Sequence, residues 1–180
     1  MNKFLLLFST ILSGCMTISK TDINCTMGKK WIQYPIALHL DRNLVEKQSV
    51  IEAIEYWNSI SVNKELFVII DEDKIGNYDK RDNKNFITSS YDYNKTSDEL
   101  AHTKRYYSDL IISEADIVIN ENYKNEIDTS TLIHELGHIL GMNHNTENDR
   151  SIMFPYKKLN QRLTNEDIQE LRCHNVWVKP

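Results

Sequence analysis

The sequence is poor in glycine, proline and cysteine, and it has no excess of positive charge. Five Gly and three Pro among 180 residues exclude a collagen-like fibre and a flexible low-complexity chain. The 21 Lys and Arg residues are outnumbered by 26 Asp and Glu, and the net charge of -5 argues against a nucleic-acid binder. With 41% hydrophobic and 26% charged residues, the chain has the composition of one globular domain with its own core.

A long apolar run is also missing. The longest stretch near the N-terminus, Phe4 to Leu12, covers nine positions, whereas a membrane-spanning helix needs about 20. Because Lys3 precedes this stretch and Leu12-Ser13-Gly14-Cys15 follows it, residues 1–14 are predicted to be a secretory signal peptide. The four residues resemble the lipobox of bacterial lipoproteins, which implies acylation of Cys15 and attachment of the exported protein to a bacterial membrane; the alternative is a plain signal peptide.

Two further cysteines lie near opposite ends of the expected mature chain. In an exported protein an even pair favours a disulfide, here between Cys25 and Cys173, over the alternative role as metal ligands. Residues 15–30 are polar and are expected to form a tether, which leaves residues 31–180 for the folded domain.

The hydrophobic pattern predicts a mixed α+β domain. Helices are expected at Leu44–Ile60, with Trp57 in the core, at Leu132–Leu140, and at Thr164–Arg172, where Thr164 and Asp167 form a capping box. Strands are expected at Tyr34–Leu40, Leu66–Ile70 (buried), Asn85–Ser89, Glu99–Thr103, Leu110–Ile112 and Ala115–Asn120. The charged region 71–98 is interpreted as solvated loops around the Asn85–Ser89 strand.

The run HELGHILGMNH, residues 134–144, contains three of the six histidines in the chain. His134 and His138 are four residues apart in a predicted helix, so both imidazoles project from one face toward a shared zinc ion. A continuing helix would carry His144 about 9 Å beyond His138, too far for the same ion. The chain must therefore turn between them, and Gly141 stands where a positive φ would allow it.

Three neutral histidines leave one zinc position open, which is typical of a catalytic site. Glu135 is then the candidate base and acid, taking a proton from the water in that position and passing it to the leaving amine. Two other hypotheses remain open: a catalytically weak surface lipoprotein that binds zinc and peptide, and a zinc hydrolase of non-peptide amides.

The spacing H-E-x-x-H-x-x-G-x-x-H resembles that of the metzincin zinc proteases, and Met153 within Ser151-Ile152-Met153-Phe154-Pro155-Tyr156 resembles their Met-turn methionine. The residues around it are similar to those of matrixins. This resemblance implies a zincin-like fold with a small twisted mixed sheet, an active-site helix, a Met-turn and a C-terminal helix. It also implies a zinc-dependent endopeptidase with one catalytic zinc.

The same resemblance assigns a substrate cleft. A protein or peptide substrate would add antiparallel to Glu99–Thr103, with Leu100 and Ala101 on the edge strand and with Pro155 and Tyr156 walling the pocket. His102 matches one ligand of the matrixin structural zinc, but Val118 stands where another would be, so no structural zinc is expected. We expect a monomer, and the sequence leaves the calcium requirement open.

Overall fold

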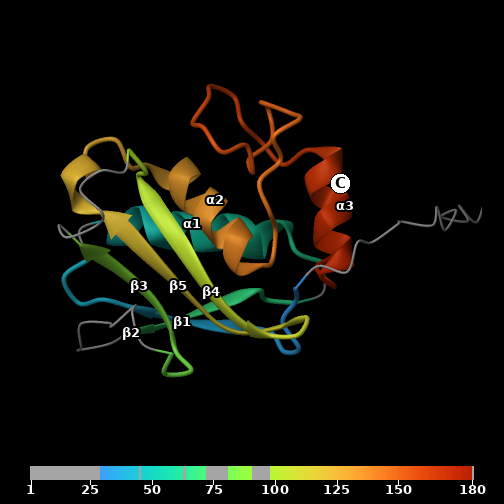
Figure 1. Ribbon diagram of the computed structural model, residues 1–180, viewed down its shortest axis with the longest axis horizontal. Coiled ribbons are helices and arrows are strands. Elements are labelled where there is room, and N and C mark those ends of the chain that lie inside the picture. The colour runs from blue at the N-terminus through green and yellow to red at the C-terminus, as the bar shows by residue number, and fades with distance from the viewer. Residues whose placement is uncertain (1–28, 45, 63, 72–80, 91–97, 180) are drawn as a thin grey trace, which may run out of the picture.

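A twisted sheet of five strands forms the centre of the computed structural model, which describes residues 29–44, 46–62, 64–71, 81–90 and 98–179 (Figure 1). The strands are β1 (Ile36–Leu40), β2 (Phe67–Asp71), β3 (Asn85–Ser90), β4 (Ala101–Ser108) and β5 (Ile111–Asn120). Their order is β2-β1-β3-β5-β4. Neighbouring strands are parallel except β4, which pairs antiparallel with β5 and lies at one edge. The predicted mixed α+β class is confirmed.

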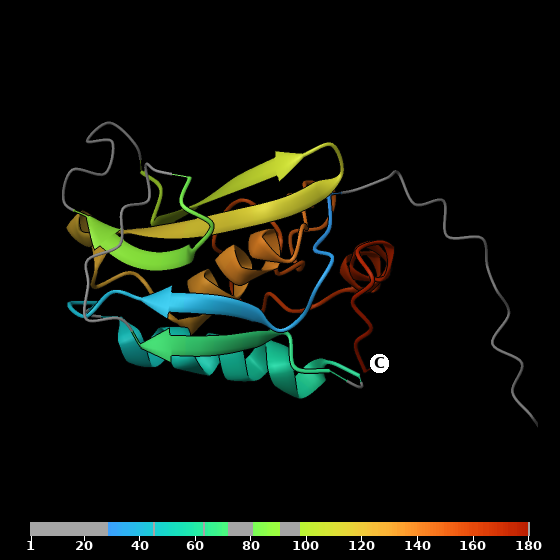
Figure 2. The same ribbon diagram turned by 90° about the horizontal axis from the view of Figure 1, so that it is seen from below.

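Two helices, α1 (Lys47–Ile60) and α2 (Thr129–Ile139), pack against each other and against the sheet (Figures 1 and 2). Trp57 of α1 is fully buried, as the spacing predicts, and its Nε1 donates to the carbonyl of Ile133 on α2 at 3.0 Å. The short 3-10 helix η1 (Glu121–Tyr123) follows β5. The last helix, α3 (Asn165–Cys173), stands apart from the sheet beyond one end of α2 (Figure 1).

The core lies between the sheet and the two central helices. Leu38, Ile87 and Ile117 of the sheet and Leu136 of α2 are fully excluded from solvent. This burial stabilises the packing of α2 against the sheet, since apolar burial contributes about 25 cal/mol per Å².

The capping box predicted for the last helix is confirmed. Thr164 is the N-cap of α3, its side chain accepts from the backbone of Asp167, and the Asp167 carboxylate accepts from the backbone of Thr164. Two of the four orphan donors at the start of α3 are thereby satisfied.

The predicted strands on the cleft side are too short. Glu99–Thr103 is wrong in extent, because β4 runs from Ala101 to Ser108, and Leu110–Ile112 and Ala115–Asn120 form the single strand β5. The polar pair Ser113-Glu114 interrupts the apolar pattern without ending the strand, because the buried Glu114 carboxylate accepts the backbone N–H of Asn83. A β-bulge between Tyr106 and Tyr107 adjusts the register of the β4–β5 pair.

The strand predicted at Leu66–Ile70 is present as β2, but it is an edge strand. Ile70 is 41% exposed while Phe67 is fully buried, so only part of this continuous apolar run faces the core. A continuous run of apolar residues in a strand therefore does not show that both faces of the strand are buried.

Several sequence predictions lie outside the described residues. These include the signal peptide, the lipidation site Cys15, nearly all of the tether at residues 15–30, and Cys25 of the predicted disulfide with Cys173. Most of the polar region between β2 and β4 also lies outside them. Within the described ranges, no helix combines the length and apolarity needed to cross a membrane.

Candidate active site

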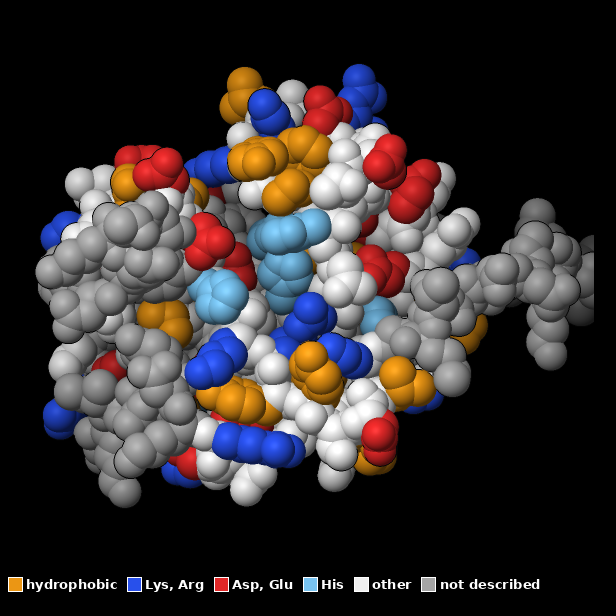
Figure 3. All heavy atoms as spheres, viewed as in Figure 1, with side chains coloured by type: hydrophobic (Ala, Val, Ile, Leu, Met, Phe, Trp, Pro, Cys, Tyr) orange, Lys and Arg blue, Asp and Glu red, His pale blue; other side chains and the backbone are white. Residues whose placement is uncertain are grey.

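A cavity of about 1200 Å³ opens between the edge strand β4, helix α2 and the segment after residue 153. The residues predicted for the zinc site and the cleft line it together: His134, Glu135, His138, His144, Leu100, Ala101, Pro155 and Tyr156. Figure 3 shows histidine side chains gathered at the hollowed centre of this face, with clusters of acidic and basic side chains around them. The sequence-predicted site residues therefore surround one space.

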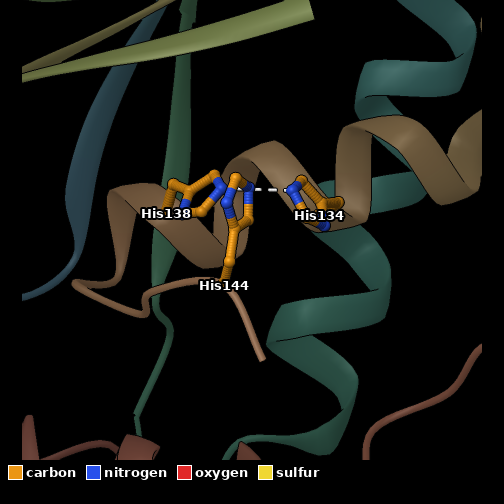
Figure 4. A group of neighbouring side chains, drawn as sticks. All are labelled: His134, His138 and His144. Carbon is orange, nitrogen blue, oxygen red and sulfur yellow. Dashed lines mark hydrogen bonds between the residues drawn. The ribbon is translucent and has the colours of Figure 1, made fainter. Parts of the chain in front are cut away.

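The three histidines of the motif converge, as Figure 4 shows. Their ligand nitrogens all lie within 4.8 Å of one another, and the Nε2 atoms of His134 and His138 are 3.1 Å apart. Nitrogens bound tetrahedrally to zinc at about 2.0–2.1 Å lie roughly 3.3 Å from each other. The spacing of these imidazoles therefore fits a zinc ion.

Two backbone carbonyls orient the helical pair of imidazoles. The Nδ1 of His134 donates to the carbonyl of Ile152 at 2.7 Å, and the Nδ1 of His138 donates to that of Met142 at 2.9 Å. A carbonyl only accepts, so each proton sits on Nδ1 and leaves the Nε2 lone pair for a metal.

The environment also keeps the rings uncharged. Burial lowers the pKa of His138 to about 3, with the neighbouring His134 adding to the effect. Burial likewise lowers the pKa values of His134 and His144. Neutral imidazole is the form that binds metal, so the three rings are ready ligands at neutral pH.

The turn expected before the third ligand is present. Helix α2 ends at Ile139, and Gly141 adopts a φ of 105°, which residues other than glycine rarely adopt. A Cβ at Gly141 would also collide with the backbone oxygen of Lys29. The turn brings His144 back toward His134 and His138, with ring centroids 5.2 Å and 4.7 Å away.

Met153 lies buried directly beside the histidine helix. A Cβ at Gly137 would lie 2.5 Å from the Met153 Sδ, so only glycine lets the helix and this sulfur approach so closely. The Met153 carbonyl accepts the N–H of Asn145, and its own N–H donates to Ser151 Oγ. The tight turn through Met153 is thereby tied to the segment that follows His144.

Glu135 is 6% exposed and its side chain lines the cavity. Its Oε2 accepts a hydrogen bond of 2.5 Å from the hydroxyl of Thr103 on β4. Burial raises the pKa of Glu135 to about 7, the Thr103 bond opposes this shift, and the Glu99 charge adds to it. A carboxyl group that titrates near neutral pH is suited to accept and return a proton.

The sequence did not reveal four residues that contact the site residues or the segment before His144. They are Thr103, Arg105, Asn143 and Glu170. Thr103 and Arg105 follow Ala101 at a spacing of two along β4, so they share the strand face that meets α2. This spacing of two can be read from the sequence only if β4 is known to continue to Ser108. The strand was predicted to end at Thr103, so Arg105 was not placed on it. Asn143 and Glu170 meet only through the tertiary fold.

The chain combines a mixed sheet with one antiparallel edge strand, a helix bearing H-E-x-x-H, a third histidine after a glycine turn, and a buried methionine. Together these features match the metzincin pattern of fold and metal site. The family model for matrixins matches residues 37–173, and the chain belongs to the matrixin family. The matrixin family and the cluster of three histidines together imply one catalytic zinc ion.

Among solved structures, the chain resembles high choriolytic enzyme 1, a hatching-enzyme zinc protease from the medaka fish Oryzias latipes. The identity is 15% and the TM-score is 0.40. The match covers 64% of this chain and 50% of the other, so the chain spans half the length of that structure. A search of curated proteins gives no match.

Proposed function

We propose that this protein is an endopeptidase that hydrolyses peptide bonds with Glu135 as general base and then general acid. The observation that carries the proposal is the position of Glu135 in the cavity. Its carboxylate is buried, adjoins the first histidine ligand, and contacts the edge strand on which a peptide would lie.

The edge strand β4 provides the means of holding a peptide. One side of β4 pairs with β5, and the other borders the cavity. An extended substrate would add to that side antiparallel to residues 99–103 through main-chain hydrogen bonds. Pro155 and Tyr156, which line the opposite wall, would contact the side chain next to the scissile bond.

Proton transfer is assigned to Glu135. The carboxylate takes a proton from the attacking water, and the same proton passes to the leaving amine nitrogen as the C–N bond breaks. The Thr103 hydroxyl holds one carboxylate oxygen, Oε2. Zinc bound by His134, His138 and His144 would polarise the scissile carbonyl and make the water more acidic.

Metal removal tests the proposal. The purified protein should cleave an unfolded protein such as casein, lose this activity in a zinc chelator, and recover it when one equivalent of zinc is restored. Binding of one zinc without cleavage of casein, gelatin or peptides would favour the peptide-binding hypothesis instead. Cleavage of small amides alone would favour a non-peptide amidase.

Export and anchoring are part of the same proposal. The N-terminal pattern supports cleavage before Cys15, acylation of that cysteine, and attachment of a monomeric catalytic domain to a bacterial membrane. The Cys15→Ala variant should leave the membrane fraction, and wild-type protein that is found only in soluble form would contradict the anchor.

The Cys25–Cys173 disulfide predicted for an oxidising compartment is tested by mass spectrometry of non-reduced peptides.

A further inference from the structure

The third zinc ligand lies on a segment without regular secondary structure, yet side chains from two distant elements hold the residue before it. Asn143 donates its backbone N–H to Glu170 Oε1 on α3 at 2.9 Å, and its side-chain Nδ2 donates to the same oxygen at 3.1 Å. Its Oδ1 accepts from Arg105 Nη2 on β4 at 3.4 Å. One amide therefore bridges a carboxylate and a guanidinium.

Arg105 extends this arrangement to the second ligand. Its Nη1 donates to the carbonyl of Met142 at 3.2 Å and lies 3.4 Å from the carbonyl of His138. The Met142 carbonyl is also the acceptor that orients the His138 ring. A single guanidinium thus contacts the end of α2 and the segment that leads to His144.

The charges on the two sides are complementary. Arg105 is half-buried, and although burial lowers the pKa of its guanidinium, the Glu170 carboxylate raises it. Arginine remains protonated at neutral pH, and hydrogen bonds that involve a charged partner are stronger than neutral ones. The three residues Arg105, Asn143 and Glu170 are called the Asn143 clamp below.

We propose that the Asn143 clamp positions His144 for zinc. Glu170 fixes the backbone one residue before His144, and Arg105 fixes the carbonyl two residues before it, so the imidazole is held near His134 and His138 before the metal arrives. Without the clamp, ordering this exposed segment would oppose zinc binding. The clamp residues are positioning residues, and the proposal rests on the zinc site of the proposed function.

The substitution Glu170→Ala removes the acceptor of both Asn143 bonds, and Glu170→Gln keeps an oxygen that can accept them. Gln169→Ala is the matched control, because Gln169 is exposed on the same helix, one residue away. The readouts are the zinc dissociation constant of the full chain, from competition with a chromophoric chelator, and the visible spectrum of the Co²⁺-loaded protein.

Partners outside the ligand shell are typically worth 10- to 100-fold in metal affinity. We expect a loss of about that size in Glu170→Ala, with a changed Co²⁺ spectrum, rescue in Glu170→Gln, and no change in Gln169→Ala.

Thermal unfolding of the metal-free variants separates positioning from general support. Glu170 also lies 3.8 Å from the buried His174, so its removal can destabilise α3. If Glu170→Ala does not fold, Asn143→Ala removes the bridging amide from an exposed position and should weaken zinc binding in the same way. Unchanged zinc affinity in a folded clamp variant would overturn the clamp. Wild-type protein that binds no zinc would overturn the proposed function and the clamp with it.

Discussion

Thr103 and Glu135 meet where the edge strand β4 packs against helix α2. The hydroxyl of Thr103 lies 2.5 Å from Glu135 Oε2 and 3.1 Å from the Glu135 backbone oxygen. Because the Thr103 hydroxyl holds the Glu135 carboxylate, it restricts the rotamers of this proposed general base. Such restriction keeps a reacting group in productive geometry.

The substitution Thr103→Val should lower kcat by about tenfold, because a hydrogen bond to a charged group is worth about 1.5 kcal/mol and each 1.4 kcal/mol is tenfold in rate. Thr103→Ser retains the hydroxyl and should stay within about threefold of the wild type. Steady-state kinetics on a fluorogenic peptide measures both variants. An undiminished kcat in Thr103→Val would show that the bond does not position Glu135.

Helix α2 begins with a cap that joins it to the far wall of the cavity. Asp128 is the N-cap and accepts from the backbone of Thr131, and its other oxygen lies 2.7 Å from the Lys157 ammonium. Burial alone would raise the pKa of Asp128, but hydrogen bonds from Lys157, Ser130 and Thr131 lower it to about 2.

Because the folded-state pKa of Asp128 lies below its ordinary value of 3.8, the ionised carboxylate stabilises the fold above about pH 4. This contribution is lost as the pH falls through about 2. At pH 7, Asp128→Ala should cost about 1 kcal/mol of unfolding free energy, as for other lost N-caps, whereas Asp128→Asn keeps the cap and should cost less. Urea unfolding of the wild type and the variants at pH 7 and pH 2.5 measures these losses of unfolding free energy. An equal loss for Asp128→Ala at the two pH values would contradict the link between the Asp128 charge and stability.

Helix α3 is joined to the methionine turn by one buried carboxylate. Asp167 accepts from Ser151 Oγ at 2.7 Å and 2.9 Å and from the backbone N–H of Thr164 at 2.9 Å. Ser151 in turn accepts the N–H of Met153. The carboxylate thereby couples the start of α3 to the turn beneath the histidines.

The substitution Asp167→Ala should destabilise the fold by about 3 kcal/mol, because it removes a cap and leaves buried donors unsatisfied. Glu166→Ala is a suitable control, since Glu166 occupies the neighbouring exposed position in the same first turn. The measurement is chemical denaturation of the metal-free proteins. A cost below about 1 kcal/mol in Asp167→Ala would mean that the network contributes little.

Sequence patterns predict the elements of this fold well where one residue type performs one local task. The Trp57 stripe, the Thr164 cap and the glycine before His144 are local requirements of a helix face, a helix end and a turn. The full length of β4 was hidden because Lys104, Arg105 and Ser108 are polar, and their strand conformation comes from pairing with β5. The clamp on Asn143 could not be predicted, since β4 and α3 contribute residues far apart in the chain.

At the scale of the whole molecule, zinc should stabilise the fold, because the three ligands come from both sides of the Gly141 turn. A zinc concentration 1000 times the dissociation constant adds about 4 kcal/mol, which corresponds to a rise in Tm of roughly 10 °C for a domain of this size. Scanning calorimetry with zinc and with chelator should show this rise. His138→Ala should abolish it and His102→Ala should retain it; a zinc-dependent rise that survives in His138→Ala would contradict the assigned ligands.

The most direct test of the account is the rate of peptide hydrolysis by Glu135→Gln at full zinc occupancy. The variant keeps all three histidines and a side chain of the same size, so one zinc per chain should remain bound. Because the amide cannot accept the proton, the rate should fall by at least about 10²-fold, the usual scale of general acid–base catalysis. A zinc-loaded variant that retains wild-type activity would contradict the central role of Glu135.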